Sequence, residues 1–183
     1  MAQHDIACDI VTGDRDLFQL VSDVGQTRVI SITKGVRNLQ IVDDAFLVEK
    51  YGIAGHQYAD FATLRGDASD GLPGVRGIGE KTASSLISTW GNLDQLLEAL
   101  QQGDASISAG VARKFAEAQD SIEPARQVVR VRTDATVTGR VESPTGIANV
   151  DVLSECVAHW GVKRQVNQLL SVLGLPNLDS VES

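Results

Sequence analysis

Residues 66–83 read Gly66-Asp67-Ala68-Ser69-Asp70-Gly71-Leu72-Pro73-Gly74-Val75-Arg76-Gly77-Ile78-Gly79-Glu80-Lys81-Thr82-Ala83. This glycine-rich stretch separates two predicted helices, over residues 57–65 and 80–90, and its last glycines form a hairpin motif. Gly77 and Gly79 let the backbone approach a phosphate closely, and the following helix begins with unpaired amides and the positive end of its dipole. Lys81 can reach the same phosphate, and Ile78 is expected to anchor the hairpin in the core. The stretch predicts a helix–hairpin–helix that binds a nucleic-acid backbone; the alternative is a tight turn whose glycines serve steric needs only.

Paired aspartates stand at two places in the first half of the chain. Asp67 and Asp70 are three residues apart where a predicted helix ends, and Asp14 and Asp16 follow a predicted strand over residues 6–12. In open α/β sheets, ligands collect at the carboxyl ends of strands, and hard cations such as Mg²⁺ and Mn²⁺ prefer oxygen ligands. The four aspartates are therefore candidates for a divalent-metal site. The alternatives are helix capping by the first pair and ordinary turn chemistry for the second.

The hydrophobic pattern predicts an α/β fold. Short apolar runs predict strands over residues 6–12, 28–33 and 39–42, and the first of these reads as buried on both faces. A helical pattern follows Asp14, and another helix is expected over residues 45–51. From residue 57 onward we expect helices only, over residues 57–65, 80–90, 93–100, 111–118, 124–131, 152–160 and 163–173.

The composition limits the classes of function. The chain has 183 residues, 43% of them hydrophobic, and a net charge of −8. This charge argues against non-specific binding of nucleic acid over a broad basic surface, because such binding comes mostly from neutralising phosphates. It is compatible with a nuclease whose carboxylates hold metals and whose few basic groups hold DNA. No apolar run is long enough to cross a bilayer and the first residues do not resemble a signal peptide, so we expect a cytoplasmic protein without a membrane partner.

Two motifs in the chain resemble those of one protein family. The stretch from Gly66 to Ala83 closely resembles the metal-and-hairpin segment of bacterial 5′ nucleases, which include the 5′→3′ exonuclease domain of DNA polymerase I and, more distantly, flap endonucleases. The stretch from Val11 to Asp23 is similar to an earlier motif of the same family, at a matching distance upstream. The resemblance covers nearly the whole chain and fades after about Arg140.

The resemblance implies an α/β fold in which a truncated PIN-like parallel sheet precedes an all-helical helix–hairpin–helix (helix-3-turn-helix) region. Residues 1–54 would be the remnant of the nuclease α/β domain, and residues 55–183 the helical DNA-binding region. The catalytic and metal-binding residues would be Asp14, Asp16, Asp67 and Asp70, which would hold Mg²⁺ or Mn²⁺ at one position of a two-metal phosphodiester hydrolysis. The DNA-binding residues would be Gly74, Val75, Arg76, Gly77, Ile78, Gly79, Lys81 and Thr82, and hairpin carbonyls can also hold K⁺. The implied substrate is nicked, flapped or branched duplex DNA with a 5′ end, bound by a monomer during replication and repair.

The chain also departs from the family pattern. The family begins with an N-terminal half that supplies an opening strand, a basic helical arch and the acidic motif for the other metal. His4, Asp5 and Asp9 do not match that motif, so we expect the polypeptide alone to have weak nuclease activity or none. Two alternatives follow: a non-catalytic module that binds duplex DNA, and an unrelated helix–hairpin–helix protein in which Asp14 and Asp16 have no metal role.

Overall fold

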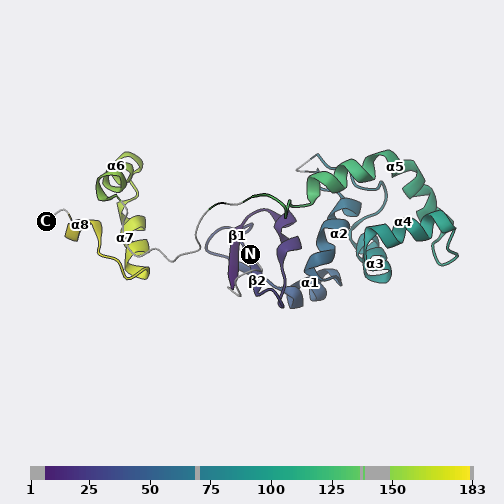
Figure 1. Cartoon of the computed structure of the whole chain (residues 1–183), viewed down its shortest axis with the longest axis horizontal. Helices are drawn as coiled ribbons and strands as arrows, with labels where there is room; N and C mark the ends of the chain where they lie inside the picture. Colours follow the sequence, from purple (N-terminus) through teal and green to yellow (C-terminus); the bar gives the residue numbers. More distant parts are fainter. Residues whose placement is uncertain (1–6, 69–70, 137, 139–148, 182–183) are drawn as a thin grey trace. The chain divides into compact units, whose positions relative to one another are not determined.

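The first strands form a small mixed sheet. The computed structural model describes residues 7–68, 71–136, 138 and 149–181 (Figure 1). Strands β1 (Cys8–Thr12), β2 (Thr27–Ser31) and β3 (Gln40–Val42) lie in the order β1-β2-β3, with β1 and β2 parallel and β2 and β3 antiparallel. Val29 of β2 pairs with Val42 of β3, and both are fully buried. The three predicted strands are therefore confirmed. The expectation that the first is buried on both faces was wrong, because Val11 is 63% exposed.

Two short 3₁₀ helices and two α-helices pack against this sheet and one another. Helix η1 (Arg15–Leu20) follows β1, and helices α1 (Asp44–Tyr51), η2 (Gly55–Gln57) and α2 (Tyr58–Arg65) follow β3. Asp43 caps α1 by accepting a hydrogen bond from the amide of Phe46 at 2.8 Å, which is the standard way to satisfy an orphan amide at a helix start.

Aromatic side chains join η1 to α2. The ring of Tyr58 lies 5.2 Å from that of Phe18 and 5.4 Å from that of Phe61, in edge-to-face and tilted arrangements. Tyr58 has no exposed surface, and burial raises the pKa of its phenol. Such pairs add about 0.5–1.5 kcal/mol each beyond the hydrophobic effect. This cluster therefore ties the loop after β1 to the start of the helical region.

Three longer helices complete the first compact unit, residues 1–133. They are α3 (Glu80–Trp90), α4 (Leu93–Gln102) and α5 (Ala109–Val129). The prediction of separate helices over 111–118 and 124–131 was wrong, since α5 runs through Pro124 without a break. Proline costs a backbone hydrogen bond inside a helix. The buried stripe Phe115, Ala118, Ile122, Ala125, Val129 on α5 offsets that loss by holding both halves against the core.

A small second unit covers residues 134–183. It contains α6 (Val150–Trp160), α7 (Lys163–Val172) and α8 (Leu178–Val181), which bury Val157, Leu170 and Leu178. The predicted helices over 152–160 and 163–173 are confirmed. The predicted boundary between residues 54 and 55, which separates the remnant of the nuclease α/β domain from the helical DNA-binding region, stays a prediction. In the described part of the chain, no helix is both long and apolar enough to cross a membrane.

A buried ion cluster connects α2, α4 and α5. Asp60 of α2 is 3% exposed and accepts hydrogen bonds from the amide of Leu93 at 2.9 Å and from Arg130 at 3.0 Å. Arg126 lies 3.7 Å from the same carboxylate and forms a two-pronged pair with Asp94 at 2.5 and 2.6 Å. Because removing one partner of a buried cluster leaves the others uncompensated, Asp60 is the residue on which the packing of these helices depends.

Asp60→Asn is therefore expected to lower the free energy of unfolding by about 3 kcal/mol, since Arg126 and Arg130 lose their shared contact with a buried carboxylate. Urea unfolding followed by circular dichroism measures this. Asp94→Asn is the matched control: that side chain is 67% exposed, so the loss should be about 1 kcal/mol. Equal losses in both variants would contradict the assignment.

Candidate functional site

Three of the four predicted metal-binding aspartates line one open pocket. This acidic pocket has a volume of about 580 Å³, and Asp14, Asp16 and Asp67 all contribute to it. Asp14 and Asp16 reach it from the end of β1 and the start of η1, whereas Asp67 reaches it from the loop that follows α2. Asp70 lies outside the described residues. Stretches that are 52 residues apart in the sequence are thus brought to the same place.

Asp14 also has the capping role that was the alternative interpretation. Its carboxylate accepts a hydrogen bond from the amide of Asp16 at 2.9 Å and begins η1. Its own amide donates to the hydroxyl of Thr12 at 3.0 Å. Capping uses one carboxylate oxygen, so it fixes the direction of the side chain and leaves the other oxygen for a second ligand.

Basic side chains share the acidic pocket with the aspartates. Arg15 donates to the carboxylate of Asp67 at 2.9 Å, and Arg65 lies 3.6 Å from the same oxygen. Lys34 and Lys50 also line the pocket, and the ammonium of Lys50 lies 4.8 Å from the centre of the Tyr51 ring. The pocket therefore has charges of both signs, which suits a site that must hold a cation and an anionic phosphate together.

The donor set fits a hard divalent cation by its chemistry. Carboxylate oxygens are what Mg²⁺ and Mn²⁺ prefer, and such ions keep several waters while using few protein ligands. Within the described residues, however, no three His, Cys, Asp or Glu side chains converge closely enough to form a complete cage. Binding of a cation would therefore require the aspartates to move closer together. Asp67 would then give up part of its contact with Arg15 to contact the ion.

The loop that carries Asp67 is held to the hairpin by backbone contacts. Asp67 and Leu72 exchange two hydrogen bonds of 2.9 Å across it, and the amide of Val75 donates to the carbonyl of Leu64 at 2.9 Å. Gly66 and Gly74 lie so close that a Cβ atom on Gly74 would come 2.5 Å from the Gly66 nitrogen. Position 74 also has φ +62°, so only glycine fits there without strain.

The hairpin over residues 74–79 has two buried side chains, and its remaining edge, the rim, is exposed to solvent. Val75 and Ile78 are 2% and 3% exposed, which confirms the prediction that Ile78 anchors the turn. Arg76, Gly77 and Gly79 are exposed on the rim. Gly79 precedes α3 in an extended conformation and provides no side-chain cap, so the first amides of α3 face solvent. Lys81, which is exposed, and Thr82, which is half-buried, lie in this first turn.

One residue at the hairpin was missed by the sequence analysis. Lys114 of α5 donates from its ammonium to the carbonyl of Gly77 at 2.8 Å, across 37 residues of sequence. Nothing in the local pattern around Lys114 marks it, because a lysine on a helix is an ordinary solvent-facing residue. Only the packing of α5 beside the hairpin brings it there.

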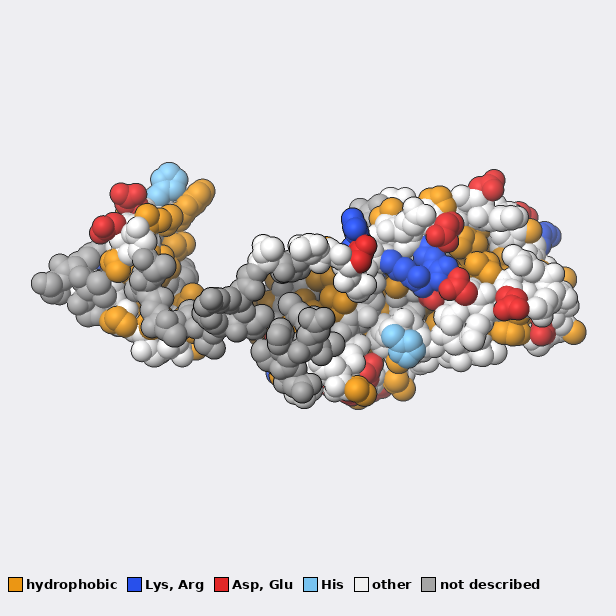
Figure 2. All heavy atoms as spheres, viewed as in Figure 1, with side chains coloured by type: hydrophobic (Ala, Val, Ile, Leu, Met, Phe, Trp, Pro, Cys, Tyr) orange, Lys and Arg blue, Asp and Glu red, His pale blue; other side chains and the backbone are white. Residues whose placement is uncertain are grey.

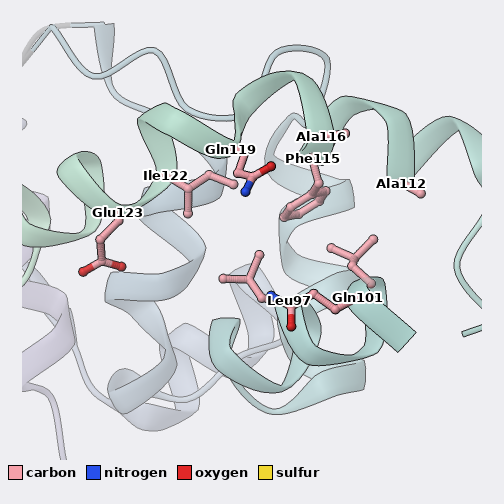
Figure 3. Close-up of a pocket in the computed structure, with 9 residues that line it drawn as sticks. Leu97, Gln101, Ala112, Phe115, Ala116, Gln119, Ile122 and Glu123 are labelled. Atoms are coloured by element: carbon pink, nitrogen blue, oxygen red, sulfur yellow. The ribbon is translucent and has the colours of Figure 1, made fainter. Parts of the chain in front are cut away.

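A second pocket lies between α4 and α5 and has a different character. Figure 3 shows Leu97 and Gln101 of α4 facing Phe115 and Ile122 of α5 across it. Its volume is about 330 Å³, and Glu123 is the carboxylate among the residues that line it. An apolar groove of this kind has no set of oxygen ligands for a metal. The acidic pocket and the hairpin are therefore the candidate site.

Comparison with known proteins gives one family. A family model described as "5'-3' exonuclease, C-terminal SAM fold" matches residues 53–151. A 5'-3' exonuclease of Streptomyces coelicolor is 44% identical over 167 residues, covering 90% of this chain and 55% of the relative. The Mycobacterium tuberculosis 5'-3' exonuclease is 37% identical over 174 residues, with 90% and 54% covered. The chain thus spans about half the length of these curated relatives.

Solved structures share the fold at low sequence identity. A T5 5'-exonuclease with bound zinc ions has a TM-score of 0.53 at 18% identity, over 67% of this chain and 42% of that one. The catalytic core of Rad2 in complex with a DNA substrate has a TM-score of 0.50 at 19% identity, over 81% and 50%. These likenesses establish a 5′-nuclease type of fold for the described α/β and helical elements.

The contact between Gly66 and Gly74 makes a prediction about stability. Gly74→Ala is expected to lower the free energy of unfolding by about 3 kcal/mol, from the positive φ and from overlap with the neighbouring backbone. Gly71→Ala is the control, because Gly71 has φ +71° but open space around its Cα, so only about 1 kcal/mol is expected. Chemical denaturation of both variants measures the difference, and similar losses would show that the close approach does not matter.

Proposed function

The chain belongs to the 5'-3' exonuclease family, and on that premise we propose that it acts in a 5′→3′ exonuclease or structure-specific flap endonuclease that hydrolyses phosphodiester bonds in DNA. The observation that carries the proposal is the meeting of Asp14 and Asp16 with Asp67 in one pocket, immediately before a hairpin suited to a sugar–phosphate backbone. The proposed substrate is a nicked, flapped or branched duplex with a 5′ end, in replication and repair.

In this proposal, Asp14, Asp16, Asp67 and Asp70 would hold Mg²⁺ or Mn²⁺. A cation held by these aspartates would supply Lewis-acid chemistry: lowering the pKa of bound water and offsetting negative charge at the phosphate. A two-metal mechanism needs further carboxylates for the other ion, and these are proposed to come from outside the present chain. The basic side chains that line the acidic pocket would have a different role from the aspartates. Arg15, Lys34 and Lys50 would hold the non-bridging oxygens of the phosphate, and the carboxylates would face the ion.

The hairpin would hold the duplex by its backbone. Gly77 and Gly79 expose main-chain amides, and the uncapped start of α3 adds a positive dipole end that favours a phosphate. Binding through a few local contacts suits a chain with a net charge of −8, which argues against a broad basic surface. On the face of the first unit visible in Figure 2, basic side chains form only small groups beside acidic ones, and no broad basic surface is seen. K⁺ at hairpin carbonyls stays a proposal, and the Gly77 carbonyl already accepts from Lys114.

Cleavage of a 5′-flap duplex with Mg²⁺ or Mn²⁺ tests the metal role. In this chain, or in a longer form of it that cleaves the flap, Asp67→Asn and Asp70→Asn should each lower the cleavage rate about a hundredfold, because metal-derived stabilisation of several kcal/mol is lost. Binding of the same flap in Ca²⁺ should change less than twofold.

Asp104→Asn is the control for charge, since Asp104 accepts from Ser106 and takes no part in the acidic pocket. Equal loss of cleavage and of binding in the Asp67 variant would contradict a metal role. Tight flap binding without cleavage, even by the longer form, would favour the non-catalytic DNA-binding module.

Lys81→Ala tests the hairpin. Duplex binding should weaken, and the slope of log affinity against log salt concentration should fall by about one phosphate contact, because one counter-ion fewer is released. Fluorescence anisotropy between 50 and 200 mM KCl gives the slope. An unchanged slope would exclude Lys81 from the interface.

A further inference from the structure

The outer part of the Lys114 side chain, from Cδ to the ammonium, lies against the hairpin. Its ammonium donates to the carbonyl of Gly77 at 2.8 Å. A Cβ atom on Gly77 would come 3.0 Å from the Lys114 Cε and 3.2 Å from its Nζ, so the lysine stem lies directly over the bare Cα of the glycine. Gly77 is thus required twice, once for its φ of +80° and once for the space that Lys114 occupies.

The polar contact of the Lys114 ammonium is an uncharged group. Within the described residues, no carboxylate lies within ion-pair distance of its ammonium, whose polar contact is the neutral carbonyl of Gly77. Its neighbour differs: Arg113 lies 3.7 Å from Glu117, one turn along α5. What sets Lys114 apart is that its ammonium is held on the carbonyl of an exposed hairpin glycine, Gly77, at 2.8 Å. Rotamer entropy is lost to hold it there, and a purely structural contact to a carbonyl would return little.

The ammonium retains binding capacity on the exposed side. It has three N–H donors, and the Gly77 carbonyl uses one. The side chain is half-buried and the rim of the hairpin around Gly77 is exposed, so the remaining donors meet solvent where the hairpin does. A phosphate oxygen is the ligand that suits such a group, because it accepts hydrogen bonds and supplies the missing negative charge.

We propose that Lys114 binds a phosphate of the duplex backbone beside the 74–79 hairpin, so that α5 contributes a contact point to the DNA-binding surface. The inference rests on the proposed function, since it takes the hairpin to be the DNA interface. The carbonyl of Gly77 orients the ammonium before DNA arrives, which lowers the entropy cost of the contact. The hairpin clamp then consists of the main-chain amides, Lys81 from α3 and Lys114 from α5.

Lys114→Gln separates this role from a purely structural one. The amide of glutamine can still donate to the Gly77 carbonyl but has no charge. Binding of a 5′-flap duplex to the full chain, measured by anisotropy in Ca²⁺, should weaken about eightfold at 0.1 M KCl, with the salt slope reduced by about 0.9. Lys114→Arg should restore the slope. Arg113→Gln is the matched control, because it removes a charge that is paired with Glu117, and it should change neither quantity by more than twofold.

Each outcome decides the proposal. An unchanged salt slope in Lys114→Gln overturns it and leaves Lys114 as a support for the hairpin. Thermal melting of each variant is recorded, and if Lys114→Gln unfolds, the slope of Lys114→Met at a temperature where it is folded decides in the same way. If Lys81→Ala lowers the slope and Lys114→Gln does not, this inference alone fails. If the unmodified chain binds no flap duplex and Lys81→Ala has no effect, the proposed function fails with it.

Discussion

The close approach of two backbone segments, at Gly66 and Gly74, is the constraint on which the candidate site depends. A Cβ atom on either glycine would lie within 2.7 Å of backbone atoms of the other segment. Asp67 follows the first glycine and Val75 follows the second, so the contact positions both a residue that lines the pocket and a buried residue of the hairpin. The paired hydrogen bonds between Asp67 and Leu72 close the loop between them. The pocket and the hairpin are thus joined by backbone contacts, so the described positions of Asp67 and Val75 depend on one another.

The charged side chains of this molecule act through local contacts. Its net charge of −8 would repel a polyanion, so the favourable contacts have to be local. At the acidic pocket, the guanidinium of Arg15 lies 2.9 Å from the carboxylate of Asp67. At the hairpin, the ammonium of Lys114 donates a hydrogen bond to the carbonyl of Gly77 at 2.8 Å. Arg126, by contrast, is paired with Asp94, whose carboxyl pKa is lowered by the hydrogen bonds from the guanidinium. Within the described residues, the ammonium of Lys114 has no carboxylate partner, and its polar contact is the carbonyl of Gly77.

The hydrophobic and ionic cores explain why the site holds its shape. The aromatic cluster around Tyr58 fixes η1, which carries Asp16, against α2, which leads into Asp67. The buried carboxylate of Asp60 joins α2 to the amide that begins α4 and to the last turns of α5. Because α5 also carries Lys114, the same packing that stabilises the helical region decides which side chain reaches the hairpin.

Local features of the chain could be predicted from its sequence. The three strands and the buried Ile78 follow from patterns of a few residues, because backbone propensity and hydrophobic alternation act over short distances. Placing Asp14 and Asp16 near Asp67 needed the family resemblance. The single helix through Pro124, the ion pair of Arg15 and the position of Lys114 were decided by tertiary structure. Each depends on contacts between residues far apart in sequence, and no local pattern encodes which distant surface a side chain will meet.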